Sequence, residues 1–308
     1  MCKGPPWSKK IVIFGSLKDM SDKIFITECP RDAMQGITEF IPTHQKVKYI
    51  NSLLKVGFDV LDFGSFVSPK VMPQMADTDE VVQALDLTNT NTKLLAIIGN
   101  QKGAERAETY PQINILGFPF SVSPTFLRRN INSDMAETVT RIGEIKEIAD
   151  RSNKDLVIYI SMAFGNPYDD PWSTEVVGEW VEKLAWIGIR KIALSDTIGE
   201  ATPESIDYLF SYVIPNFPEV EFGAHFHTTP SNWRANIEAA YNAGCRKFDA
   251  ALKGYGGCPM AKDSLTGNLP TENLLGFFKE KNVPLALDEQ AFGYSMNLTL
   301  ETFPMEHA

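Results

Sequence analysis

The segment Glu221-Phe-Gly-Ala-His225-Phe-His227-Thr-Thr-Pro230 reads as a short apolar strand that ends in two histidines. Side chains two positions apart in a strand point to the same side, so His225 and His227 can face one point from positions about 7 Å apart. Thr229 and Pro230 are typical of a helix N-cap and first turn, which predicts a helix directly after the strand. Such a histidine pair is a candidate metal site, although an isolated pair at a strand end is more often only hydrogen-bonded.

The pattern of a strand followed by a helix repeats along the chain. Strands are expected at residues 24–27, 59–63, 93–98, 113–118, 155–162, 190–194, 220–225 and 246–252. The helices expected after them span residues 47–56, 78–87, 104–110, 133–152 with Ser133 as cap, 173–187, 202–213, 231–242 and 271–281. Eight such units favour parallel βαβ connections and a closed (β/α)8 TIM barrel. A doubly wound sheet is the alternative, but no glycine-rich fingerprint follows the first strand.

The barrel is expected to occupy residues 23–283 as a single domain, because no change in composition divides this part of the chain. Residues 1–22 form an N-terminal extension, which we expect to plug the bottom of the barrel with an extra strand. Residues 284–308 form a C-terminal tail that packs on the outside of the barrel or on a partner. A homodimer is one assembly that would provide such a partner.

The composition argues against several classes of protein. A formal net charge of -10 and a pI near 5.0 leave no basic face for general nucleic-acid binding. The four cysteines form no CxxC pair, which favours a reduced, cytoplasmic compartment. No secretory or transit segment is recognisable, and no apolar run has the length of a membrane span. We therefore expect a cytoplasmic protein that binds neither nucleic acid nor membrane.

In a TIM barrel the active site lies at the carboxyl ends of the strands. Polar residues follow most of the expected strands at that point: Glu28 to Asp32, Asp62 with Ser65, Ser161, Ser195 to Thr197, the two histidines, and Lys253 to Asn268. Any one of these could stand there by chance, but together they predict a site at this end of the barrel.

Asp32, His225, His227 and the amide oxygen of Asn268 would form a ligand set of oxygen and imidazole without thiolates. This set favours Mg²⁺ or Mn²⁺ over a structural zinc. Asp32 by itself would more often be a cap or turn residue, and Asn268 could equally be a left-handed turn residue. Arg31, beside Asp32, is a candidate to neutralise an oxyanion near the metal, and a surface salt bridge is its alternative role.

Cys258 follows the glycine-rich segment Gly254-Tyr-Gly-Gly257. Glycines allow a loop to move over a site, and a free thiol with a pKa of about 8.5 is mainly a proton donor at neutral pH. Cys258 is therefore a candidate acid or nucleophile. For Cys29 and Cys245 we expect buried, inert thiols.

Several longer segments together resemble one known family. They are Thr27-Glu-Cys-Pro-Arg-Asp-Ala-Met-Gln35, Ser65-Phe-Val-Ser-Pro-Lys70 with Pro73-Gln-Met75, Ser195-Asp-Thr-Ile-Gly199, His225-Phe-His227, and Gly256-Gly-Cys-Pro259 with Gly267-Asn-Leu269. In this order they resemble the 3-hydroxy-3-methylglutaryl-CoA lyases, which belong to the metal-dependent TIM-barrel lyases and synthases with a DRE-like signature. The resemblance covers about residues 24–280, and SFVSPK and GGCP are its most specific parts.

This resemblance implies that an acyl-CoA is the substrate. Metal-assisted cleavage of a carbon–carbon bond in 3-hydroxy-3-methylglutaryl-CoA would yield acetyl-CoA and acetoacetate. In the family, the positions of Asp32, His225, His227 and Asn268 hold the divalent ion, Mg²⁺ or Mn²⁺ here. A base must take the hydroxyl proton, and His225 is our candidate for this role.

The resemblance also assigns roles around the ligand set. The position of Arg31 stabilises the enolate oxygen, and that of Cys258, in a mobile loop, helps to protonate the product carbanion. Asp62 is a further candidate catalytic residue, since a carboxylate there could orient Arg31 or a ligand. Lys70 and Lys253 are candidates to bind the CoA phosphates.

Four features depart from the family pattern, and the first is the N-terminal extension of about 20 residues. Asp62 stands where the family usually has Glu, so a carboxylate that orients Arg31 or a ligand would have a reach that is shorter by over roughly 1 Å, enough to matter for catalysis. Thr228 stands where the family usually has Asp, so a carboxylate that supports the metal ligands is missing. The interval from Cys258 to Asn268 is one residue longer than expected. A relative that acts on a different 3-hydroxyacyl-CoA is therefore also consistent with the sequence.

Three other functions stay open at this point. A Claisen-condensing acyltransferase of the same superfamily would join an acyl-CoA to a 2-oxo acid, although the GGCP loop favours the lyases. A pyruvate-type aldolase would act without CoA. A non-catalytic barrel that binds a metabolite would retain the fold and lose metal binding or turnover.

Overall fold

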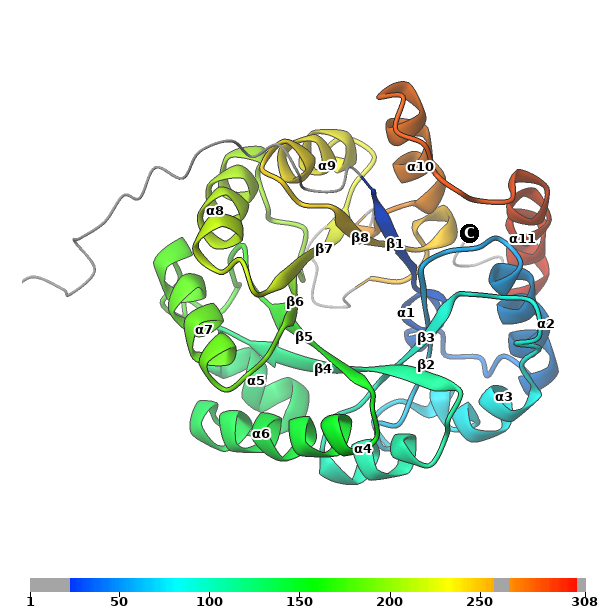
Figure 1. Ribbon diagram of the computed structural model, residues 1–308, viewed down its shortest axis with the longest axis horizontal. Coiled ribbons are helices and arrows are strands. Elements are labelled where there is room, and N and C mark those ends of the chain that lie inside the picture. Colours follow the sequence, from blue (N-terminus) through cyan, green and yellow to red (C-terminus); the bar gives the residue numbers. More distant parts are fainter. Residues whose placement is uncertain (1–22, 258–265, 304–308) are drawn as a thin grey trace, which may run out of the picture.

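The computed structural model describes residues 23–257 and 266–303 of the chain. Within these residues, parallel strands close into a barrel with helices around it (Figure 1). The strands are β1 (Phe25–Glu28), β2 (Val60–Ser65), β3 (Lys93–Ile97), β4 (Ile113–Ser121), β5 (Asp155–Ser161), β6 (Lys191–Asp196), β7 (Glu221–Thr228) and β8 (Lys247–Ala250). The barrel is closed because β1 pairs with both β2 and β8, and β7 with both β6 and β8. The predicted TIM barrel is confirmed.

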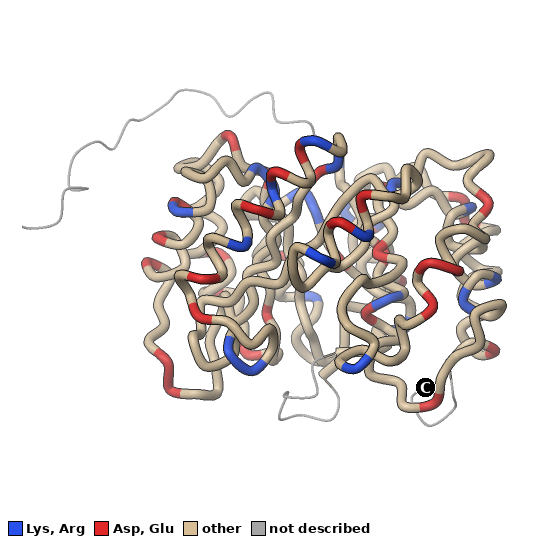
Figure 2. The backbone as a smooth tube through the Cα atoms, turned by 90° about the horizontal axis from the view of Figure 1, so that it is seen from below, with Lys and Arg blue, Asp and Glu red and all other residues tan. Residues whose placement is uncertain are grey.

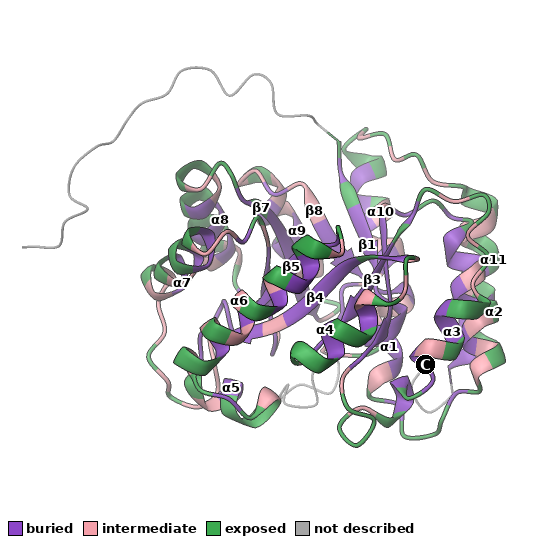
Figure 3. Ribbon diagram, turned by 60° about the horizontal axis from the view of Figure 1, so that its bottom comes forward, coloured by how far each residue is buried: buried purple, intermediate pink, exposed green. Residues whose placement is uncertain are grey.

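An outer ring of helices covers the barrel. It consists of α2 (Thr43–Leu54), α3 (Thr78–Ala84), α4 (Gln101–Glu108), α6 (Met135–Arg151), α7 (Thr174–Trp186), α8 (Pro203–Asn216), α9 (Trp233–Asn242) and α10 (Thr271–Glu280). Each helix buries its apolar side against the strands and turns its polar side to solvent (Figure 3). Acidic and basic positions are interspersed along these helices (Figure 2). Among the described residues, no helix combines the length and the apolar composition that crossing a membrane requires.

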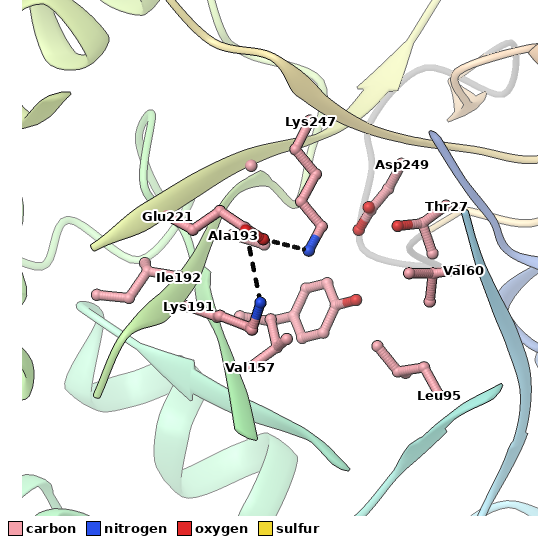
Figure 4. A pocket seen from close by; sticks show the side chains of 12 residues that line it. Thr27, Val60, Leu95, Val157, Lys191, Ile192, Ala193, Glu221, Lys247 and Asp249 are labelled. Carbon is pink, nitrogen blue, oxygen red and sulfur yellow. Dashed lines mark hydrogen bonds and ion pairs between the residues drawn. The ribbon is translucent and has the colours of Figure 1, made fainter. Parts of the chain in front are cut away.

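The centre of the barrel is filled with side chains below the predicted site. Inward-facing residues of the strands form a separate apolar cluster that consists of Val60, Leu95, Ile97, Ile115, Val157, Tyr159 and Ala193. At the bottom, Glu221 accepts hydrogen bonds from Lys247 at 2.8 Å and from Lys191 at 3.4 Å (Figure 4). A small pocket between these layers reaches up to Asp249. The candidate site residues Asp32, His225 and His227 lie at the opposite, carboxyl end of the strands, where TIM barrels carry their active sites.

Strand β7 and helix α9 differ from their predicted bounds. The strand continues to Thr228 because a short strand, β9 (Gly267–Asn268), pairs with its end in the antiparallel direction. Thr229 and Pro230 lie in a turn, where the Thr229 amide donates to the Asn232 side chain at 2.7 Å. The prediction that Thr229 caps the helix is therefore wrong, and α9 begins at Trp233.

Helix α6 is also capped differently from the prediction. Asp134, and not Ser133, is its N-cap, because the Asp134 carboxylate accepts the Glu137 amide at 2.9 Å. The Glu137 side chain bonds back to the Asp134 amide, which completes a capping box. Smaller elements were not predicted from the sequence: α1 (Pro30–Gln35), α5 (Pro124–Ile131) and the 3-10 turns η1 (Pro73–Met75) and η2 (Leu252–Gly254).

The chain after the barrel contains a further helix, α11 (Glu289–Thr302), that packs along α2 on the outside of the barrel (Figure 1). Ser295 donates a hydrogen bond to Ser52 at 2.9 Å, and Lys48 pairs with Glu301 at 2.6 Å. The predicted plug formed by residues 1–22 lies outside the described residues.

Candidate active site

Two elements from opposite ends of the chain bring three predicted ligands together. Strand β7 carries His225 and His227, and helix α1 carries Asp32. The Nε2 atoms of His225 and His227 lie 3.8 Å and 3.9 Å from Oδ2 of Asp32. One donor atom from each of the three side chains lies within 4.8 Å of the others. The structure therefore brings these residues together as a candidate metal-binding group.

Local sequence explains why α1 presents its acidic side chain to the barrel. Pro30 occupies the first position of the helix, where its missing amide hydrogen costs nothing. Asp32 follows in the first turn, where the partial positive charge of a helix N-terminus favours an anion. Both Arg31 and Asp32 are buried, so the helix delivers a charged pair to the inside of the site.

Two of the ligand atoms have no hydrogen bond within the described residues. Oδ2 of Asp32 and Nε2 of His227 are both buried there without a hydrogen bond. Burial works to raise the pKa of Asp32, but Arg31 and the two histidines hold this pKa well below its usual range. An ionised carboxylate oxygen and an imidazole nitrogen that face one another without a proton donor are suited to share a cation. This observation fits a divalent ion.

Asn268 reaches the same place from β9, where it lies opposite His227 in the strand pairing. Its amide nitrogen donates to the Tyr255 carbonyl at 2.8 Å. This bond engages the amide nitrogen, and the Asn268 oxygen accepts no hydrogen bond from the residues that the structure describes, so it is the atom suited to act as a ligand. The side chain is buried, as are those of Asp32 and His227.

A second layer of contacts orients the histidines. Nδ1 of His227 lies 2.8 Å from the Thr197 carbonyl, which can only accept, so Nδ1 carries the proton and Nε2 is left as a ligand. Nδ1 of His225 lies 3.2 Å from Oδ2 of Asp249 on β8. Burial works to lower the pKa of His225, but Asp249 and Asp32 outweigh it and raise this pKa.

Sequence reasoning missed Asp249 and the Thr197 carbonyl. The available signal for Asp249 was its place on the last strand. It lies opposite His225 in the register of β7 and β8, so both side chains face the inside of the barrel. A backbone carbonyl such as that of Thr197 leaves no signal in residue identity.

Arg31 is held between two carboxylates. Its Nε donates to both oxygens of Asp62, at 3.2 Å and 3.0 Å, and its Nη2 also bonds to Asp62. Its Nη1 donates to Asp32 at 2.9 Å and to Gln35 at 2.8 Å. Of the five guanidinium hydrogens, one on Nη2 has no acceptor in the described part of the chain. Arg31 is therefore fixed in position and retains a donor.

The structure bears on the two substitutions that depart from the family pattern. The shorter Asp62 still reaches Arg31 with both oxygens, so its length does not break this contact. The Thr228 hydroxyl is buried and has no hydrogen bond within the described residues, so it supports neither histidine. The Thr197 carbonyl supports His227 in its place.

The remaining predicted residues fall into different positions. Lys70 is exposed in the loop after β2, and Lys253 is partly buried in η2. Cys258 lies outside the described residues. Burial raises the pKa of the Cys29 thiol well above its ordinary value and that of Cys245 to about 12, in accord with inert thiols.

Comparisons with known proteins match most of this chain. A family model described as HMGL-like matches residues 23–297. A hydroxymethylglutaryl-CoA lyase of Bacillus subtilis is 32% identical over 262 residues, which cover 85% of this chain and 87% of the relative. An (R)-citramalyl-CoA lyase of Chloroflexus aurantiacus is 31% identical over 271 residues, or 85% of each chain. A solved HMG-CoA lyase from Acinetobacter baumannii, in complex with coenzyme A and 3-methylmalate, has a TM-score of 0.84 at 32% identity, with 93% of each chain covered.

Proposed function

The chain belongs to the HMGL-like family, and we propose that it is a metal-dependent lyase that cleaves 3-hydroxy-3-methylglutaryl-CoA to acetyl-CoA and acetoacetate. The observation that carries the proposal is the group of Asp32, His225 and His227, with two unpartnered ligand atoms, beside the fixed guanidinium of Arg31. A binding barrel without catalysis would have no need for this combination. The named relatives make cleavage of an acyl-CoA the reaction that best fits it.

Asp32, His225, His227 and Asn268 would hold the ion, which we propose to be Mg²⁺ or Mn²⁺ because the donors are oxygen and imidazole nitrogen. When bound, such an ion polarises substrate oxygens and lowers the pKa of a hydroxyl group. The fit rests on the buried Oδ2 of Asp32 and Nε2 of His227, which lack partners among the described residues.

His225 is our candidate for the base that takes the proton of the tertiary hydroxyl. Asp249 behind the ring supports this role, because a carboxylate at Nδ1 stabilises the imidazolium that proton transfer creates. The raised pKa of His225 acts in the same direction. Ligation and proton acceptance both use Nε2, so His225 would take the proton only while Asp32, His227 and Asn268 hold the ion.

Loss of the hydroxyl proton allows the C2–C3 bond to break. The carbon that bore the hydroxyl becomes the ketone of acetoacetate, and the bonding electrons pass to the thioester as an enolate. The free Nη2 hydrogen of Arg31 is suited to donate to the enolate oxygen, since Asp62 keeps the guanidinium in place. A proton must then reach the enolate carbon, and we propose Cys258 as its source.

A second candidate substrate is (R)-citramalyl-CoA, because a lyase for it is about as similar to this chain as the hydroxymethylglutaryl-CoA lyases are. Citramalyl-CoA cleavage would use the same groups and release pyruvate in place of acetoacetate. We propose that Lys70 or Lys253 binds the CoA phosphates, and that the enzyme is cytoplasmic.

A substrate panel tests the proposal. The enzyme is incubated with 3-hydroxy-3-methylglutaryl-CoA or (R)-citramalyl-CoA, with Mn²⁺, Mg²⁺ or EDTA, and acetyl-CoA and the keto acid are measured. We expect acetyl-CoA and acetoacetate to form with Mn²⁺ or Mg²⁺ and not with EDTA. Pyruvate from citramalyl-CoA alone would establish the second substrate, and free CoA released only with an added 2-oxo acid would indicate the condensing reaction.

A further inference from the structure

The segment Leu252–Gly257, here called the loop base, connects the last barrel strand to the part of the chain that leads to β9. Side chains from three elements hold its backbone. The Leu252 amide donates to Glu28 at 2.9 Å, and the Lys253 amide donates to Glu272 at 3.0 Å. The Tyr255 carbonyl accepts the Asn268 amide at 2.8 Å. The loop base is therefore tied to β1, α10 and β9.

The loop base also lies directly against the proposed ligands. Gly256 has a φ of +85°, and a Cβ added there would lie 2.5 Å from the Asp32 carbonyl oxygen and 2.8 Å from the Asn268 amide nitrogen. Only a residue without a side chain allows this approach. A displacement of the loop base toward these residues would therefore move Asp32 or Asn268.

Lys253 indicates how firmly the loop base is held. Its φ of 59° and ψ of 10° place it in the left-handed region, where a residue with a side chain is strained. Such a conformation persists only where the surrounding contacts determine it. The bonds from Glu28, Glu272 and Asn268 to the loop base are those contacts.

The C-terminal helix α11 makes the remaining contact. The Tyr255 ring lies 4.6 Å from the Phe303 ring, with an angle of 34° between their planes. Phe303 in turn packs edge-on against Tyr49 of α2 at 5.5 Å. Tyr255 and Phe303 are both buried. Tyr255 therefore contacts the end of α11 through its ring and Asn268 through its backbone carbonyl.

We propose that α11 is a positioning element of the active site: by holding Tyr255, it fixes the loop base and, through it, the Asn268 side chain of the proposed ligand set. The positioning residues are Tyr255 of the loop base and Phe303, which directly follows α11. The inference rests on the proposed function, because it takes Asn268 to be a metal ligand.

Contacts with α2 would suffice if α11 served only to cover the barrel. Ser295 bonds to Ser52, and Lys48 pairs with Glu301, at sites that do not involve the loop base. Variants at Phe303 remove its ring contacts with Tyr255 and with Tyr49 of α2, and leave the two polar contacts with α2 in place. Mn²⁺ affinity and kcat, read beside Tm, therefore separate the two roles.

The test compares Phe303→Leu with Tyr255→Phe and with Leu300→Ala, a control at an exposed position of the same helix. Mn²⁺ affinity is measured by EPR titration in the absence of substrate. The values of kcat and KM are measured with 3-hydroxy-3-methylglutaryl-CoA, and Tm is measured by thermal unfolding. We expect Phe303→Leu to weaken Mn²⁺ binding and to lower kcat by about 10-fold each, with KM unchanged. Tyr255→Phe keeps the aromatic ring against Phe303, so its losses in Mn²⁺ affinity and kcat should be smaller. Leu300→Ala should match the wild type in both.

A lower Tm for Phe303→Leu with wild-type Mn²⁺ affinity and kcat would show that α11 only stabilises the fold, and would overturn the inference. Mn²⁺ binding and cleavage by the wild type distinguish this result from a failure of the proposed function. If the wild type binds Mn²⁺ but cleaves no 3-hydroxyacyl-CoA, the proposed reaction is wrong, and the Mn²⁺ affinities still decide the role of α11.

Discussion

Oδ2 of Asp249 lies 3.2 Å from Nδ1 of His225, on the side of the ring away from Asp32. The histidine therefore stands between two carboxylates that come from neighbouring parts of the barrel. Asp32 faces Nε2, the atom with access to the site, and Asp249 faces Nδ1. This arrangement sets both the tautomer and the proton affinity of the ring.

Asp249→Asn tests the effect of Asp249 on the proton affinity of His225. Loss of the carboxylate removes a group that raises the pKa of His225, so the ring stays unprotonated to lower pH. We expect kcat to fall by about 10- to 100-fold and the acid limb of the pH–rate profile to move to lower pH. An acid limb at its wild-type position would mean that His225 does not act as the base.

Asp62→Glu tests whether the shorter carboxylate limits the enzyme. Asp62 already binds Arg31 through both oxygens, and it is fully surrounded, so an added methylene has no free space. We expect no gain in kcat and a loss of about 1–3 kcal/mol in the free energy of unfolding. Denaturant unfolding and steady-state kinetics check both. A clear rise in kcat would show that Arg31 is poorly placed by Asp62.

Glu28 predicts a pH dependence of stability. Burial raises its pKa from 4.5 to about 8, although hydrogen bonds from Thr271 and Leu252 oppose this shift. The folded state therefore binds the Glu28 proton more tightly than the unfolded state does. This contribution to stability is fully present below pH 4.5 and is lost as the pH rises to about 8.

Glu28→Gln should flatten the fall in stability over this range, because glutamine stays neutral. The measurement is the free energy of unfolding at several pH values between 5 and 8, set between the two pKa values for Glu28. Glu238→Gln, on the exposed side of α9, is the control and should retain the wild-type slope. An equal slope in Glu28→Gln would assign the pH dependence to other groups.

Ser195→Ala should stabilise the protein. The Ser195 hydroxyl is buried and has no hydrogen bond within the described part of the chain, so its removal abolishes a desolvated polar group. We expect a gain of about 1 kcal/mol in the free energy of unfolding. Ser121→Ala is the matched comparison and should lose stability, because Ser121 bonds to the Ser161 carbonyl and the Ser123 amide. A loss of stability in both variants would mean that Ser195 has a partner, such as a buried water.

The sequence was sufficient to predict the barrel, and three of the candidate ligands, Asp32, His225 and His227, lie together in it. Alternating apolar strands and helices determine the fold class, and the spacing of His225 and His227 determines that both face inward. Once the barrel closes, Asp32 must lie near them, because β1 and β7 both flank β8. The ligand hypothesis therefore needed only local patterns and the rule that active sites lie at strand ends.

Other features depend on contacts that local patterns do not encode. Asp249 was missed because its role follows from the register between β7 and β8, which is a tertiary property. The continuation of β7 to Thr228 depends on pairing with β9, more than 30 residues later in the chain. The contact between Tyr255 and Phe303 joins two segments whose sequences show no sign of one another.

The central claim is that Asp32, with His225 and His227, holds the ion on which cleavage depends. The most direct test is an EPR titration of Mn²⁺ into the wild type and into Asp32→Asn, followed by the cleavage assay on the same samples. The account predicts that the wild type binds Mn²⁺ tightly and releases acetyl-CoA, and that Asp32→Asn loses both properties while it stays folded by circular dichroism. Wild-type Mn²⁺ affinity in Asp32→Asn would contradict the proposed ligand set.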